Sequence, residues 1–184
     1  MRKLSKKTIE KRNAEFNALP PMKKRVAVAK DVLLQLEAGK LVAQSMSYGH
    51  IEGKGGSSPI PSGPLQDTLI QMSESGIVCA GCAKAAAMIS RARLGNAVTV
   101  DGSFQSTEKY AHSVTDEIFG DKCAEVIEGV FEGWGYGSGI SAESKAIREF
   151  TLGLRNESSH DRMVAIYKNI VKNRGRLVIG KYKY

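Results

Sequence analysis

Apolar residues recur at steps of three or four along several segments of the chain, which is the spacing of one face of an α-helix. This pattern predicts helices over residues 22–38, 77–94, 121–131, 141–152 and 161–173. Shorter helical pieces are expected over 65–72, 107–112 and 115–119, and short strands over 41–48, 97–100 and 176–179. The pattern therefore predicts an α+β fold that is predominantly helical, a single compact domain with a minor small sheet.

Residues rich in turn formers separate these segments. Residues 49–64 contain five Gly, three Ser and three Pro and are expected to form a long loop. A second glycine-rich loop is expected over 133–139. Pro20 and Pro21 separate a polar N-terminal stretch from the rest, because proline cannot continue a helix. We therefore expect a basic arm over residues 1–21, either a surface helix or a frayed tail, and a globular domain over 22–184.

The positive charge is concentrated at the two ends of the chain. Of the 27 Lys and Arg residues, ten lie in residues 1–30 beside two acidic residues, while residues 31–184 hold 17 of each sign. Residues 162–184 contain seven basic residues and no acidic one, and residues 108–132 contain seven acidic ones. The basic ends can bind phosphate groups, or they can simply be solvated or rest on the acidic segment.

Length, composition and cysteine count limit the class of protein. A chain of 184 residues that is 42% hydrophobic is large enough for one core and is not a disordered chain. It has no apolar run long enough for a membrane span. The basic start at Arg2 and Lys3 is not followed by the apolar region of a signal peptide. With an odd number of cysteines, three, the chain is expected in the cytoplasm.

Cys79 and Cys82 have the spacing of a zinc or redox pair. Zinc would need two more ligands, for which His112 and Cys123 are the candidates. Both paired cysteines fall on the apolar face of the helix predicted over 77–94, where cysteine acts as a small hydrophobic residue. We therefore expect core packing and no metal or other cofactor, with a cysteine- or zinc-dependent enzyme as a remaining alternative.

The two glycine-rich segments do not match the known nucleotide-binding motifs. Only three residues separate Gly49 from Gly53-Lys54, and the prolines that follow prevent the helix of a P-loop. Lys54 and nearby backbone amides can still meet an anion. The second segment lacks the spacing of the dinucleotide fingerprint, but it carries Trp134 and Tyr136. These aromatic rings can stack on a base, or Trp134 can instead anchor its loop to the core.

Four short stretches of the chain carry a resemblance to a known family. They are residues 26–32 with Gly39 and Lys40, residues 79–83, residues 127–132, and the set Arg162, Ile166, Asn169, Ile170, Asn173 and Gly175. In these stretches the chain resembles a family of uncharacterised small proteins of bacteria and tailed bacteriophages. No activity is assigned to that family, so the resemblance implies no catalytic residue. It implies a phage accessory protein in the host cytoplasm, with an anti-defence role such as sequestering a nucleotide signal.

These observations favour a binding protein without enzymatic activity, whose ligand carries phosphate groups and is a nucleotide or a nucleic acid. The residues predicted to contact the ligand are Lys54, Trp134, Tyr136, Arg174 and Arg176, and those predicted to contact nucleic acid are Lys23, Lys24 and Arg25. The alternative is a protein–protein interaction module. In that case an apolar face around Ala83, Ala86 and Ala87 would pack against a host protein or a second copy of the chain.

Overall fold

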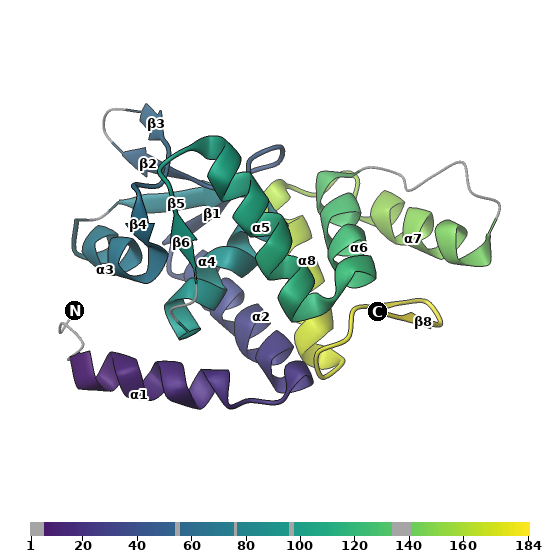
Figure 1. Cartoon of the computed structure of the whole chain (residues 1–184). Helices are drawn as coiled ribbons and strands as arrows, with labels where there is room; N and C mark the ends of the chain where they lie inside the picture. Colours follow the sequence, from purple (N-terminus) through teal and green to yellow (C-terminus); the bar gives the residue numbers. More distant parts are fainter. Residues whose placement is uncertain (1–5, 54–55, 76, 96–97, 134–140) are drawn as a thin grey trace.

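The computed structural model of the chain describes residues 6–53, 56–75, 77–95, 98–133 and 141–184. Helices make up most of this part, and short strands form a four-stranded sheet and two separate strand pairs (Figure 1). The predominantly helical α+β fold predicted from the sequence is therefore confirmed. No helix in the described ranges has the length and apolar character that crossing a membrane requires.

The helices are α1 (Lys6–Asn17), α2 (Pro21–Glu37), α3 (Leu65–Ser75), α4 (Ala83–Gly95), α5 (Phe104–Phe119), α6 (Asp121–Glu132), α7 (Ala142–Gly153) and α8 (Ser159–Lys172). The strands are β1 (Leu41–Ala43), β2 (His50–Gly53), β3 (Gly56–Ser58), β4 (Gly63–Pro64), β5 (Val78–Gly81), β6 (Thr99–Val100), β7 (Val178–Ile179) and β8 (Tyr182–Lys183). Serine side chains cap several helix starts, and Ser103, Ser141 and Ser158 each accept a hydrogen bond from a first-turn amide.

Helix α4 lies at the centre of the molecule and is buried on almost every side. It packs against α1, α2, α3, α5 and α6. Its sequence is rich in alanine, and small side chains let neighbouring helices approach closely. The burial extends to the polar residues Lys84, Ser90 and Arg91 of this helix. The hydrophobic core is accordingly built around α4, with large buried side chains such as Tyr167, Phe119 and Phe131 contributed by the helices that surround it.

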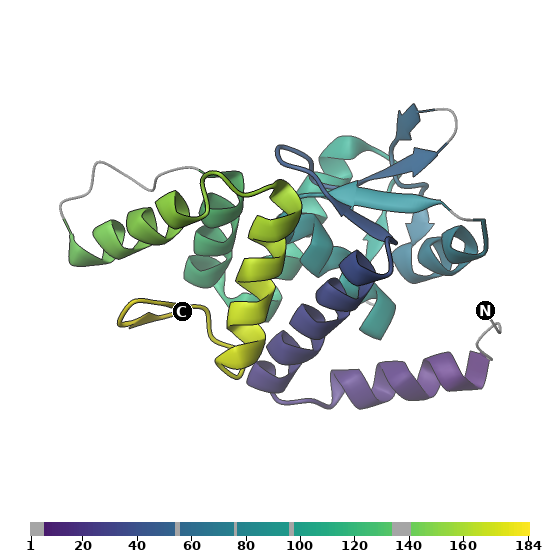
Figure 2. The ribbon, with the colours of Figure 1, turned by 180° about the vertical axis from the view of Figure 1, so that it is seen from behind.

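The sheet has the strand order β1-β5-β2-β3 and lies at one end of α4 (Figures 1 and 2). Strands β1 and β5 are parallel, with Leu41 opposite Cys79, while β2 is antiparallel to β5 and to β3. The chain leaves β5 directly into α4, and it leaves β1 into a loop over residues 44–49. Both of these connections lie at the carboxyl end of the parallel pair, which places the loop beside the start of α4.

Helices α2 and α8 lie side by side and form one flank of the molecule (Figure 2). Pro21 occupies the first helical position of α2, where its missing N–H group costs nothing. Gly39 follows α2 with a positive φ of 63°, as predicted from its position after the last apolar residue. The two basic ends of the sequence are thus brought together on one flank, because α2 begins within the first and most of α8 lies within the second.

Three segments differ from the sequence-based prediction. The segment 77–94 begins as strand β5 and only then becomes helix α4, so Cys79 lies in a strand and is not on a helix face. The segment 49–64, predicted as a loop, contains β2, β3 and β4. The pieces predicted over 107–112 and 115–119 are one continuous helix, α5. In each case pairing or packing with a distant segment decided the local conformation.

The N-terminal arm contains a helix, α1, which rests on the C-terminal end of α4. Phe16 is its buried residue, and the Arg91 guanidinium lies 5.0 Å from the centre of the Phe16 ring. Hydrogen bonds also hold α1 against α3 and α4. An Arg12 nitrogen donates to the carbonyl oxygen of Arg93 at 2.6 Å, and the side-chain amides of Asn13 and Gln66 exchange two hydrogen bonds.

Substitution of Gly175 tests the close contact between the end of α8 and the start of α2. Gly175 has a φ of +95°, and an added Cβ would lie 2.6 Å from the backbone oxygen of Met22. Gly175→Ala is therefore expected to lower the free energy of unfolding by about 1–3 kcal/mol, measured by denaturant titration. Gly153→Ala is the matched control, because nothing lies within 4 Å of its added Cβ. Equal stability of the two variants would contradict the contact.

Candidate functional site

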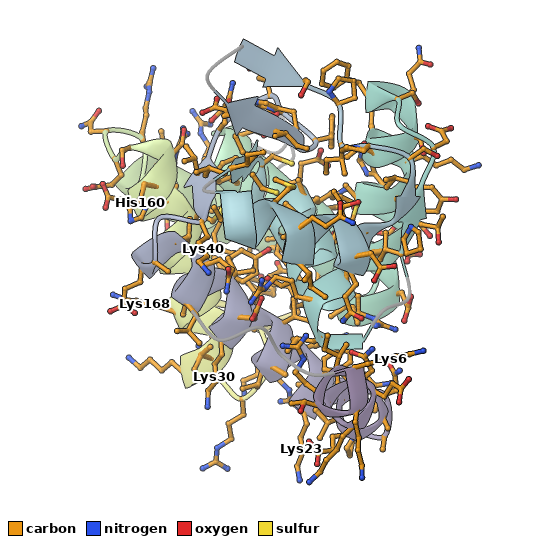
Figure 3. All side chains as sticks on the ribbon, turned by 90° about the vertical axis from the view of Figure 1, so that its left-hand side faces the viewer. Lys6, Lys23, Lys30, Lys40, His160 and Lys168 are labelled. Atoms are coloured by element: carbon orange, nitrogen blue, oxygen red, sulfur yellow. The ribbon has the colours of Figure 1, made fainter. Side chains whose placement is uncertain are left out.

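A basic groove lies along the flank formed by α2 and α8. Its volume is about 390 Å³, and it is lined by Met22, Lys23, Val26, Lys30, Val171 and Arg174. Lys23, Lys30 and Arg174 are exposed, and within the described residues none of the three side chains forms an ion pair or a hydrogen bond with another side chain. Figure 3 shows Lys30 and Lys168 on the same side of the molecule, with Lys23 below them.

The composition of the basic groove defines what it can bind. Its three cations surround a floor of Met22, Val26 and Val171, and no acidic residue is among its described lining residues. The two lysines are seven positions apart, so they project from the same face of α2 about 10 Å apart along the helix axis. None of the lining residues that the structure describes has an aromatic ring for stacking on a base. An extended anion with several charges therefore matches this surface better than a single nucleotide does.

The structure brings some of the predicted binding residues together and separates others. Lys23 and Arg174, which are 151 positions apart in the sequence, line the same groove. Lys30 was not among the predicted contacts, although it lies two turns after Lys23 on the same face of α2. Lys24 and Arg176 do not line the groove. The remaining predicted contacts, Lys54, Trp134 and Tyr136, lie outside the described residues.

Arg25 faces a different side of α2 from Lys23. Its Nε atom donates a hydrogen bond to the carbonyl oxygen of Ile118 at 2.9 Å, so its guanidinium rests against the corner between α5 and α6. Two positions along a helix correspond to a rotation of about 200°. Lys23 and Arg25 therefore do not contribute to one surface, and the predicted basic run over residues 23–25 divides between two faces.

A second polar site, which we call the Lys84 cluster, lies at the start of α4. The Lys84 side chain is 3% exposed, and its ammonium lies 2.8 Å from Glu128 Oε2 and 2.8 Å from His112 Nδ1. The Tyr48 hydroxyl donates to the other carboxylate oxygen of Glu128 at 2.9 Å. The Tyr48 and His112 rings are in contact, with centroids 5.0 Å apart. The cluster therefore joins α4, α5, α6 and the loop over residues 44–49.

The hydrogen bonds of the Lys84 cluster fix the roles of its groups. A charged ammonium only donates, so Nδ1 of His112 accepts from Lys84 and the ring proton lies on Nε2. Burial, followed by the hydrogen bond to Glu128, raises the pKa of Tyr48 and keeps its hydroxyl a donor. Every charged group of the cluster has a partner, which is the condition under which a buried charge is tolerated.

Glu132, one helical turn after Glu128, holds the same loop. Its carboxylate accepts the Met46 backbone N–H at 3.1 and 2.9 Å. Burial raises the pKa of Glu132, and the hydrogen bond from Met46 opposes that rise. Two carboxylates of α6 thus receive donors from one loop. The sequence shows the acidic segment over residues 108–132 but gives no sign that Glu128 and Glu132 turn inward.

The three cysteines are free and buried. Cys79 and Cys82 are both buried, so the predicted core packing is confirmed. The prediction that both lie on one face of a helix is wrong, because Cys79 lies in β5 and Cys82 lies just before α4. Within the described ranges, no group of three or more His, Cys, Asp or Glu side chains has the arrangement of a metal site. Burial raises the pKa of both Cys79 and Cys82 to about 12, which keeps the thiols protonated at neutral pH.

The alanine face proposed for partner binding is not a surface. Ala83, Ala86 and Ala87 are each 0% exposed, because α2, α5 and α6 enclose α4. A partner would therefore need a different surface.

Comparisons of the chain with protein-family models, with curated proteins and with solved structures find no match.

Removal of the Lys84 ammonium tests the cluster as a structural cross-link. Lys84→Met leaves Glu128 without its cation and is expected to cost about 3–5 kcal/mol of unfolding free energy. The exposed Lys109 on α5 is the control, and Lys109→Met is expected to stay within about 0.5 kcal/mol of wild type. The double variant Lys84→Met/Glu128→Gln should recover part of the stability. If the effects of Lys84→Met and Glu128→Gln, each measured alone, add up to the effect of the double variant, the two residues are not coupled.

Thiol labelling tests the burial of the cysteines. Because a thiolate is the reactive species, thiols with a pKa near 11 or 12 are expected to react negligibly with a disulfide reagent at pH 8. In denaturant, all three should react within minutes. Rapid labelling of even one cysteine in the native protein would contradict the packing described for β5, α4 and α6.

Proposed function

We propose that this protein binds nucleic acid through the phosphate backbone, without reading base sequence, and that the basic groove is the contact surface. The observation that carries the proposal is the convergence of Lys23, Lys30 and Arg174 around one groove whose described lining is free of carboxylates. Electrostatic contact of this kind releases counterions from the nucleic acid and supplies most of the affinity in sequence-independent binding.

Further exposed lysines lie on α8 near the basic groove. Lys168 and Lys172 are exposed one turn apart on α8, and Figure 3 shows Lys168 above Lys30 on the same side of the molecule. The carboxylate nearest in sequence to Lys30 is Asp31, which is engaged with Arg93 at 3.1 Å on another side of α2. The cations of the groove are therefore not neutralised by their immediate sequence neighbour. The aliphatic floor can carry the methylene stems of the lysines while their ammonium groups reach outward.

Salt-dependent binding to a fluorescent single-stranded oligonucleotide of mixed sequence, followed by anisotropy, tests this function. Wild-type affinity is expected to fall steeply as the salt concentration rises. The slope of log affinity against log salt concentration is set by the number of phosphates that the protein neutralises. Lys23→Gln/Lys30→Gln should weaken binding about tenfold and reduce the slope by about 0.7 for each phosphate that is no longer neutralised. A second, unrelated oligonucleotide sequence should show the same decrease in affinity.

The control variant is Lys109→Gln/Lys145→Gln, which removes the same net charge from exposed positions on α5 and α7. It is expected to bind within about twofold of wild type, since its charges lie away from the groove. Binding that ignores salt, or an equal decrease in affinity in the two double variants, would rule out the basic groove as a phosphate-backbone site.

A further inference from the structure

A second cavity, which we call the hairpin cleft, opens between the corner of α5 and α6, helix α7 and the β7–β8 hairpin. It has a volume of about 630 Å³, and its lining includes Arg25, Phe119, Gly120, Glu143, Tyr182 and Tyr184. Helix α7 and the hairpin lie at the end of the molecule opposite α3 (Figures 1 and 2). The volume falls within the range of small-molecule sites, roughly 300–1,000 Å³. Among the residues that the structure describes, the basic groove and this cleft share no lining residue.

Arg25 provides a fixed anion-binding group at one wall of the cleft. Its Nε donates to the carbonyl oxygen of Ile118, which holds the guanidinium in place, and within the described residues no carboxylate pairs with its two terminal nitrogens. A Cβ at Gly120 would lie 3.6 Å from the Arg25 Nη2 atom, so Gly120 lies next to the guanidinium. A guanidinium fork held in this way matches a carboxylate or phosphate group in geometry and charge.

The other charges of the cleft leave a positive balance. Glu143 accepts hydrogen bonds from Lys122 at 2.6 Å and from the Tyr184 hydroxyl at 3.0 Å, so its carboxylate is already engaged. Asp121 is the second carboxylate of the lining and is exposed to solvent, as is Lys183. The two positive charges of Arg25 and Lys183 exceed the one negative charge of Asp121. The cleft therefore favours a ligand with negative charge.

Two tyrosine side chains also line the cleft. Tyr182 and Tyr184 are both partly buried, and the hydrogen bond to Glu143 holds the Tyr184 ring in place. Lys122 lies over the Tyr184 ring, 5.7 Å from its centre, and Lys181 lies over the Tyr182 ring, 5.6 Å from its centre. The buried side chains of Phe119 and Cys123 add apolar groups to the lining. Flat apolar surfaces of this kind pack against a planar ring.

We propose that the hairpin cleft binds a small aromatic compound that carries one anionic group, with the ring against Tyr182 and Tyr184 and the anion on Arg25. The shared chemistry is a planar ring bearing a phosphate or a carboxylate, as in a nucleoside monophosphate or an aromatic acid. This site is independent of nucleic-acid binding at the basic groove.

Titration of ¹⁵N-labelled protein with four probes, followed by NMR and calorimetry, tests the site. The probes are adenosine monophosphate, benzoate, adenosine and inorganic phosphate. Adenosine monophosphate or benzoate is expected to shift the amide signals of Gly120 and Lys122, with adenosine and phosphate at least tenfold weaker. A response to adenosine monophosphate alone identifies a phosphate ligand, and a response to benzoate alone identifies a carboxylate ligand.

Two variants locate the anion. Arg25→Lys keeps the charge but removes the fork and is expected to weaken binding about tenfold. Lys183→Gln changes an exposed side chain, so it leaves the fold intact, and it is expected to weaken binding at least threefold. Lys23→Gln/Lys30→Gln, the variant that tests the basic groove, should bind the probe like wild type.

The proposal is overturned if neither anionic probe shifts signals of the cleft residues. It is also overturned if Arg25→Lys and Lys183→Gln both bind like wild type, or if adenosine and phosphate match adenosine monophosphate in affinity. Weakened binding confined to Lys23→Gln/Lys30→Gln would assign the probe to the basic groove and would remove the cleft as a site. If the oligonucleotide does not bind at the basic groove, the tests of the hairpin cleft keep the same meaning.

Discussion

Complete enclosure of α4 is the constraint on which the other features of this structure depend. Its alanines let α2 and α5 pack closely against it, and its sheet-facing end continues directly from β5. Enclosure also buries Lys84, whose charge then requires compensation within the core. Glu128, His112 and Tyr48 supply that compensation, and each comes from a different element. One buried ammonium therefore fixes the relative positions of two helices and one loop around the start of α4.

The same packing explains where the surface charges collect. Because α2 and α8 both lie on the flank of the core, the two basic ends of the chain meet there, and the basic groove forms between them. Helix α2 serves two surfaces, since Lys23 and Lys30 face the groove while Arg25 turns to the corner of α5 and α6. Each surface thus has its own cations, and the two differ in their floors: aliphatic in the groove and aromatic in the hairpin cleft.

The acidic segment of the sequence has an internal role as well as an external one. Glu128 and Glu132 of α6 both bind the loop over residues 44–49, through the Tyr48 hydroxyl and the Met46 amide. Asp121 and Glu125, on the outer face of the same helix, are exposed. Lys84 matches the charge of Glu128 inside the fold.

The sequence by itself determined the helix content, the ends of α2 and the burial of the cysteines, because these depend on local spacing, proline and glycine geometry, and apolar character. Tertiary structure decided the rest. Pairing with β1 and β2 made 78–81 a strand inside an apparently helical run, since hydrogen bonds to distant strands outweighed local propensity. Packing of α2 on α8 brought Lys23 to Arg174, and burial of α4 turned Ala83, Ala86 and Ala87 from an expected surface into core. Contacts between residues far apart in the chain have no periodic signature, so only the folded structure reveals them.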